Sequence, residues 1–168
     1  MFVKKQYALD KGKYIEEKIQ ILTSKSSLSF AYLLVPKNVE LPAPTIIAMH
    51  QYGSMEFGSD EIVGNIGDPN LFYGKELAER GYVVFAMDAA SLGERKDTVN
   101  ESSEIREKRH AQDLFIRGYS PLGIIAQEDI LALDYLNSLE VVDKNNIGCI
   151  GHSFGGIRCM YLAALDKR

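Results

Sequence analysis

The stretch IGCIGHSFGG, residues 147–156, places a serine between two apolar segments. The residues from Asn146 to Ile150 have the short, continuous apolar run of a strand that is covered on both faces. The longer apolar segment from Phe154 to Leu165 is typical of a buried helix. Ser153 therefore lies on a predicted tight turn from strand to helix, and the pattern G-x-S-x-G in this setting predicts a nucleophile elbow.

The residues around Ser153 fit the chemistry of such a turn. Gly151 and Gly155 would remove side chains that otherwise collide where the strand meets the helix. The first N–H groups of the helix, including that of Phe154, have no partner within it and point toward the charge that forms on a substrate oxygen. His152 is expected to point away from Ser153. The alternative is a glycine-rich turn with an incidental serine.

Strands and helices alternate along the rest of the chain. Two strands, around 15–21 and 28–35, are predicted to form an antiparallel hairpin. Buried strands follow at 45–49, 82–87 and 146–150, with helices at 71–80, after Ser120-Pro121 and at 154–165. This order predicts an α/β protein with a mainly parallel sheet and helices on both faces. We expect one domain over 1–168, with a polar insertion at 91–119 that contains a charged helix near 103–116 and forms either part of a lid or a plain surface helix.

Active sites in such sheets lie at the carboxyl ends of the parallel strands. The residues that follow the two other buried strands are therefore expected to lie next to the predicted elbow. After 45–49 comes His50-Gln51-Tyr52-Gly53, which we interpret as an oxyanion loop. Tyr52 is expected to supply a backbone N–H, with Gln51 beside it and His50 shaping the loop by hydrogen bonds. After 82–87 comes Asp88, which we interpret as a loop anchor, able to pair with Arg95, rather than as the catalytic acid.

Several stretches carry a resemblance to a known family. They are His50-Gln51 with Gly53, Gly67-Asp68-Pro69, Glu76-Leu77-Ala78, Arg80 to Val84, Gly93-Glu94-Arg95, 133–136, and Ile147-Gly148 running into 151–156. With these, the chain resembles α/β-hydrolases of the dienelactone-hydrolase-like and acetyl-xylan-esterase-like branch. The dienelactone hydrolases proper have a cysteine where this chain has Ser153. The resemblance implies hydrolysis of a small-molecule ester through an acyl-enzyme, with no metal and no cofactor.

The acid and base of a catalytic triad are not evident in these 168 residues. The fold orders its triad as serine, acid and then histidine. Asp166 is the only carboxylate after Ser153, and thirteen helical residues put it about 20 Å away. His110 is expected to be a solvated surface residue. We therefore expect an N-terminal fragment, truncated after the nucleophile helix, with acid and base beyond residue 168. The alternatives are an inactive binding or structural module, or a subunit completed by another chain.

Composition narrows the possible partners. A net charge of −4 with no basic stripe argues against nucleic acid. No apolar run approaches the roughly 20 residues of a membrane span, and no secretory signal is apparent, so a cytoplasmic protein is expected. Cys149 and Cys159 are predicted to be buried free thiols, and the three histidines lack metal-ligand spacing with a cysteine. The oligomeric state stays open.

Overall fold

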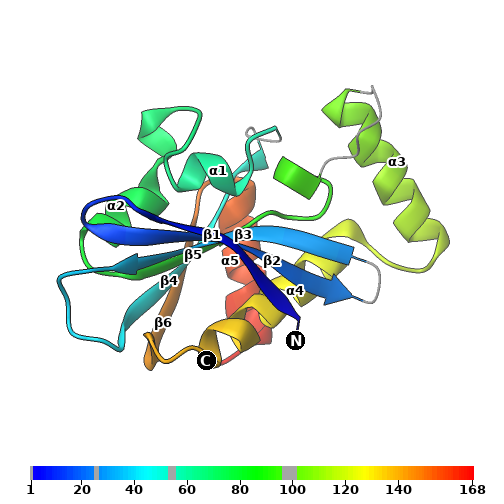
Figure 1. Ribbon diagram of the computed structural model, residues 1–168. Coiled ribbons are helices and arrows are strands. Elements are labelled where there is room, and N and C mark those ends of the chain that lie inside the picture. Colours follow the sequence, from blue (N-terminus) through cyan, green and yellow to red (C-terminus); the bar gives the residue numbers. More distant parts are fainter. Residues whose placement is uncertain (1, 25–26, 53–55, 96–101) are drawn as a thin grey trace.

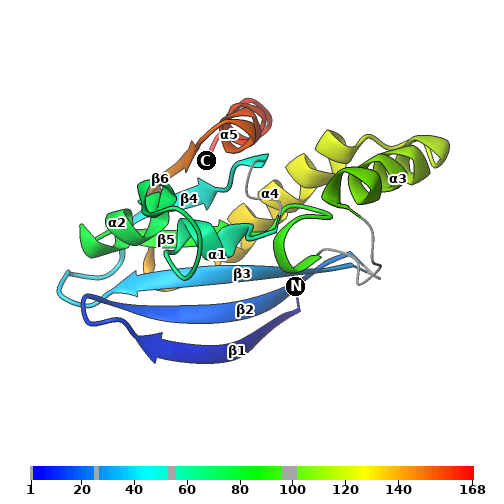
Figure 2. The same ribbon diagram turned by 90° about the horizontal axis from the view of Figure 1, so that it is seen from above.

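The computed structural model describes residues 2–24, 27–52, 56–95 and 102–168 (Figure 1). Its centre is one six-stranded sheet with the strand order β1-β2-β3-β5-β4-β6 (Figure 2). The strands are β1 Val3–Asp10, β2 Tyr14–Ser24, β3 Ser27–Pro36, β4 Ala43–Met49, β5 Val83–Met87 and β6 Val142–Gly151. The helices are α1 Ser59–Ile62, α2 Tyr73–Glu79, α3 Ser103–Ile116, α4 Pro121–Asn137 and α5 Phe154–Leu165, with short 3₁₀ turns at η2 Pro69–Leu71 and η3 Gly93–Arg95.

Helices cover both faces of the sheet, as the sequence predicts. Alternate residues of β5 point to opposite faces, so that Phe85 packs toward α4 and α5 while Val84 packs toward α1 and α2. The strands β4, β5 and β6 are parallel, also as predicted. Their carboxyl ends consequently meet at one edge of the sheet, where β6 leads directly into α5.

The antiparallel part of the sheet is larger than the predicted hairpin, and the sheet as a whole is mixed. The pairs β1–β2, β2–β3 and β3–β5 are antiparallel. The sequence does not indicate β1, because this outer strand is exposed along nearly its whole length and lacks a buried apolar alternation. Glu16 of β2 is fully buried beside Lys11, although a carboxylate in a strand near the edge of a sheet would ordinarily face solvent.

The helix boundaries follow local chemistry. Ser120 caps α4, with its hydroxyl accepting from the Gly123 N–H at 3.1 Å, and Pro121 is the first helical residue. Gly81 follows the last turn of α2 with a φ of +98°. The predicted charged helix is α3, which lies beside the start of α4 and projects past the sheet (Figure 2). A lid role for residues 91–119 stays a prediction, and residues 96–101 lie outside the described ranges.

Three further features concern the described residues alone. None of their helices combines the length and the apolar character that a membrane crossing requires. Within the same ranges, no group of three His, Cys, Asp or Glu side chains is arranged to hold a metal ion. Cys149 and Cys159 are free thiols, but both are half-buried rather than fully buried.

Candidate active site

Ser153 occupies an unusual backbone conformation between β6 and α5. Its φ is +53° and its ψ is −117°, and it is one of two non-glycine residues with positive φ among those described. Such a conformation is costly for a residue with a side chain, so the surrounding structure must impose it. The serine is exposed and precedes the first turn of α5, where N–H groups have no partner within the helix. The strand–turn–helix setting expected from the sequence is present.

The glycines on either side make this turn possible. A Cβ atom on Gly151 would lie 2.8 Å from the Cα of Gly155 and closer still to its carbonyl group. A Cβ atom on Gly155 would lie 2.8 Å from the carbonyl carbon of Met49 and would overlap its oxygen. Both obstacles are backbone atoms, which cannot rotate away as a side chain can. The turn at Ser153 is thus pressed directly against the end of β4.

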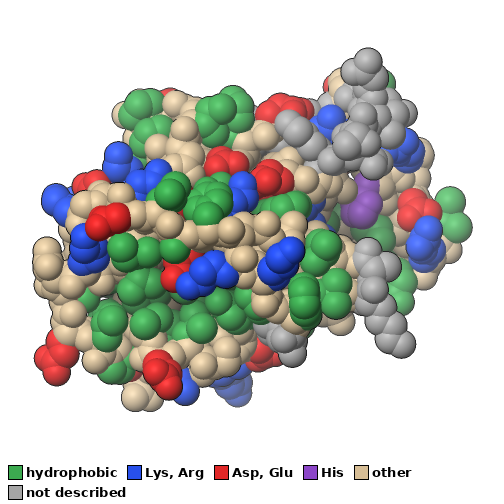
Figure 3. Space-filling model, viewed as in Figure 1, with side chains coloured by type: hydrophobic (Ala, Val, Ile, Leu, Met, Phe, Trp, Pro, Cys, Tyr) green, Lys and Arg blue, Asp and Glu red, His purple; other side chains and the backbone are tan. Residues whose placement is uncertain are grey.

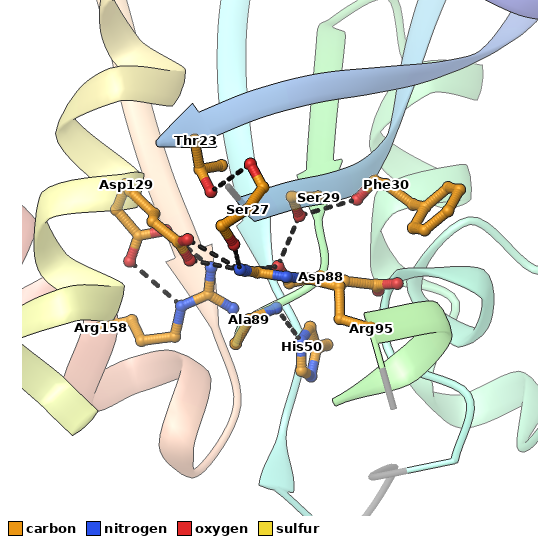
Figure 4. Close-up of polar contacts among 11 residues, drawn as sticks. Thr23, Ser27, Ser29, Phe30, His50, Asp88, Ala89, Arg95, Asp129 and Arg158 are labelled. Atoms are coloured by element: carbon orange, nitrogen blue, oxygen red, sulfur yellow. Dashed lines mark hydrogen bonds and ion pairs between the residues drawn. The ribbon is translucent and has the colours of Figure 1, made fainter. Parts of the chain in front are cut away.

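His50 joins the two other strand ends. The Ala89 N–H donates to His50 Nε2 at 3.0 Å, so this nitrogen carries the lone pair and the proton resides on Nδ1 (Figure 4). Nδ1 then donates to the Gln51 carbonyl oxygen at 3.1 Å. Burial lowers the pKa of His50 to about 3, and the positive charge of Arg158 adds to this effect. His50 is therefore a neutral hydrogen-bonding residue, with both ring nitrogens engaged.

Asp88 anchors the loop that follows β5. One carboxylate oxygen accepts from the N–H and the hydroxyl of Ser59, each at 2.7 Å, and the other accepts from the Glu94 N–H at 2.9 Å. Burial raises the pKa of this carboxyl to about 6, although the three hydrogen bonds lower it. Arg95 donates to the backbone oxygen of Asp88 at 3.3 Å, and its ion-pair partner is Glu128. Asp88 is thus a loop anchor, as predicted, and its contact with Arg95 is made by the backbone oxygen rather than by the carboxylate.

Two buried ion pairs, which the sequence analysis did not predict, lie beneath the site. Arg158 of α5 makes a two-pronged contact with Asp129 of α4, at 3.1 Å from Nε and 2.6 Å from Nη2 (Figure 4). Arg95 makes a similar contact with the neighbouring Glu128, at 2.6 and 2.8 Å. The sequence does contain a signal for the first of these pairs, because Arg158 is the only charged residue in the apolar segment 154–165. A single charge on a helix that the sequence predicts to be buried needs a partner.

A small pocket adjoins the elbow. The rings of Tyr52 and Phe154 meet edge to face, with their centroids 6.1 Å apart. They form part of the wall of a pocket of about 120 Å³, which Leu92 and Ile125 also line. The Tyr52 hydroxyl donates to Glu107 of α3. The structure thus brings the predicted oxyanion loop to the predicted nucleophile turn. Gln51 donates to the buried Glu61, and Gly53 lies outside the described residues.

His110 differs from its predicted environment. It is half-buried and lines this pocket, whereas the sequence indicated a solvated residue. The charged character of the segment suggests an exposed surface, but part of the polar side of α3 faces a cavity rather than bulk solvent. His152, in contrast, is exposed.

Comparisons with known proteins assign the family. A family model described as the abhydrolase family matches residues 2–168. The chain belongs to the abhydrolase family. It is 31% identical over 142 residues to the protein YtaP of Bacillus subtilis (strain 168), which is assigned as a hydrolase. This membership confirms the predicted resemblance.

Solved structures agree with the α/β-hydrolase fold. A Bacteroides fragilis NCTC 9343 protein assigned as an acetyl xylan esterase matches 99% of the chain with a TM-score of 0.89 at 22% identity. Acetyl xylan esterase 1 from Thermoanaerobacterium sp. JW/SL YS485 matches 97% with a TM-score of 0.68 at 18% identity. The abhydrolase chain spans 44% of YtaP and 46% and 48% of these two structures, so it covers about half the length of such relatives.

The buried neutral His50 predicts how stability depends on pH. Its pKa is lowered to about 3 from an ordinary 6.5, so between these values the unfolded state binds a proton that the folded state does not. The stabilisation is complete above pH 6.5 and is lost as the pH falls toward 3. Relative to His50→Gln, the wild type should lose up to about 1.4 kcal/mol of unfolding free energy per pH unit.

Urea denaturation followed by circular dichroism, repeated from pH 7 to pH 4, measures this difference. His152→Gln, at the exposed neighbour of Ser153, serves as the matched control for the loss of a histidine side chain. Parallel slopes for wild type and His50→Gln would show that folding does not lower the pKa of His50.

Proposed function

We propose that this abhydrolase is a serine hydrolase that cleaves carboxylic esters, with Ser153 as the nucleophile. The observation that carries the proposal is the backbone of Ser153, held at a φ of +53° between β6 and α5 by glycines that no larger residue could replace without collision. Strained backbone conformations of this kind persist only where the surrounding structure imposes them, and they cluster at functional sites. A merely structural turn at this place would have no need to expose a serine hydroxyl.

In the proposed reaction, Ser153 Oγ attacks the carbonyl carbon of the ester. The negative charge that develops on the carbonyl oxygen is held by the N–H of Phe154 and by the N–H of Tyr52 from the oxyanion loop. Collapse of the tetrahedral intermediate expels the alcohol and leaves an acyl-enzyme on Ser153. Water then attacks the acyl-enzyme and releases the acid. Gly151 and Gly155 shape the turn, and Gln51 and His50 hold the oxyanion loop.

The base in this scheme is a histidine outside residues 1–168, oriented by an acid that also lies outside them. His50 is unsuited to the role because its ring nitrogens are engaged by Ala89 and Gln51, and its lowered pKa makes it a weak base. The names of related proteins, which include acetyl xylan esterases, support ester hydrolysis rather than another reaction of the fold.

Covalent labelling of the full-length protein by a fluorophosphonate probe tests the assignment. The probe reacts with activated serines, so the wild type should be labelled and Ser153→Ala should not. Ser138→Ala is the matched control, because Ser138 is an exposed serine at the far end of α4 and its removal should leave labelling intact. Labelling that persists in Ser153→Ala would sink the proposal. A well-folded, unlabelled wild type would instead favour a binding or structural module.

A further inference from the structure

The helix α3 contacts the segment that follows β4 through two neighbouring side chains. Glu107 accepts a hydrogen bond from the hydroxyl of Tyr52, which belongs to the predicted oxyanion loop. Arg106, the residue before it, pairs at 3.2 Å with Glu56, four positions after Tyr52. The helix itself projects past the sheet beside the start of α4 (Figure 2). These contacts therefore join an outlying helix to the loop next to Ser153.

The side chain of Tyr52 is held along its whole length. Its ring meets the ring of Phe154 edge to face, and the hydroxyl at its far end is held by Glu107. Both rings pack against buried apolar side chains, which are Ala89, Ala90, Leu92 and Ile125. A tyrosine side chain has only two rotatable bonds. Fixing the ring and the hydroxyl therefore also constrains the backbone of Tyr52.

The acceptor in this contact is a carboxylate. Glu107 is half-buried and lines the pocket of about 120 Å³ that Tyr52 and Phe154 also line. A hydrogen bond to a charged acceptor is stronger than one between neutral groups. A negative charge close to a developing oxyanion would by itself oppose the reaction. Any benefit of Glu107 to catalysis must therefore come from its hydrogen bond rather than from its charge.

We propose that Glu107 is a positioning residue for ester hydrolysis, an inference that rests on the proposed serine hydrolase function. By accepting from the Tyr52 hydroxyl, Glu107 holds the Tyr52 backbone N–H in the place where it donates to the oxyanion. Such donors stabilise the transition state because they are oriented before the charge develops. Loss of an interaction that is made only in the transition state lowers kcat and leaves KM nearly unchanged.

Hydrolysis of para-nitrophenyl acetate by the full-length protein tests this role. Glu107→Ala removes the acceptor and should lower kcat by roughly tenfold, with KM within about twofold of the wild type. Glu107→Gln removes the charge but keeps a side-chain oxygen that accepts a hydrogen bond, so kcat should stay within about threefold of the wild type. Tyr52→Phe keeps the backbone N–H but lacks the hydroxyl, and should slow the reaction as Glu107→Ala does. The double variant Tyr52→Phe with Glu107→Ala should be no slower than either single variant, because both changes break the same contact.

Glu104→Ala is the matched control. It removes a carboxylate one helical turn before Glu107, from an exposed position where Glu104 pairs with Lys108. Acidic and basic side chains are interspersed over the face of the molecule shown in Figure 3, so the loss of one surface carboxylate changes the overall field little. Glu104→Ala should therefore keep the kcat and KM of the wild type.

The outcomes separate this inference from the function on which it rests. Equal kcat values for Glu107→Ala and Glu107→Gln, or equal effects of Glu107→Ala and Glu104→Ala, would overturn the positioning role while ester hydrolysis stands. A loss of activity in Glu107→Ala that only matches its loss of folded protein, measured by circular dichroism, would overturn it as well. If the wild type neither hydrolyses the ester nor is labelled at Ser153 by the fluorophosphonate, the serine hydrolase assignment fails, and the role of Glu107 fails with it.

Discussion

A Gly155→Ala variant is expected to lose about 3 kcal/mol or more of unfolding free energy, whereas Gly156→Ala should stay within about 1 kcal/mol of the wild type. The added methyl group on residue 155 would collide with the Met49 carbonyl and lie 3.1 Å from the His50 carbonyl oxygen. On residue 156 the nearest atom is the Gly151 carbonyl oxygen at 3.3 Å. That contact is tight but can relax, and alanine favours a helix over glycine.

Chemical denaturation measures the two stabilities, and fluorophosphonate labelling reports on the turn. Because relief of the clash must move the end of β4 away from α5, Gly155→Ala should also label more slowly than Gly156→Ala. The pair is closely matched, since both variants add one methyl group to adjacent positions of α5. Equal stability and equal labelling of the two variants would mean that the close approach of Gly155 to Met49 does not shape the turn at Ser153.

The local rules of the sequence predicted much of this fold. Alternation of strands and helices gave the parallel strands β4, β5 and β6, and the Ser120-Pro121 pair marked the start of α4. The features that the sequence did not predict depend on contacts between parts of the chain that are distant in sequence. The strand β1 is held by pairing with β2 rather than by its own apolar pattern, and Glu16 is buried although a carboxylate in such a strand would ordinarily face solvent.

In the candidate site, too, local features could be predicted from the sequence and long-range contacts could not. Ser153, Gly151 and Gly155 could be found from a five-residue pattern because their spacing is local. The pairing of Arg158 with Asp129 joins residues 29 positions apart, and no short pattern encodes it. The exposure of His110 was predicted wrongly for a related reason. Whether a polar helix face meets solvent or a pocket depends on which parts of the chain pack opposite that face.

The buried contact between Arg158 and Asp129 fixes α5, and with it Ser153, to α4. Both side chains are almost fully buried, at 1% and 2% exposure. Burial by itself would lower the pKa of Arg158, but the charge of Asp129 and its hydrogen bonds, with smaller contributions from Cys159 and Glu128, together offset this and raise the pKa. Removal of either partner leaves a charge in the interior without its counter-ion. Arg158→Met or Asp129→Leu alone should therefore cost about 3–5 kcal/mol of unfolding free energy.

The double variant measures the interaction between the two side chains separately from the effect of removing each one. Two apolar side chains of similar volume leave no unpaired charge, so Arg158→Met with Asp129→Leu should cost far less than the sum of the two single changes. Chemical denaturation of the wild type, the two single variants and the double variant completes this double-mutant cycle. Simple additivity would show that the contact carries no coupling. If the double variant is stable yet labels more slowly with the fluorophosphonate, the ion pair serves to position Ser153, because a purely stabilising contact would be replaced by its apolar equivalent without loss of reactivity.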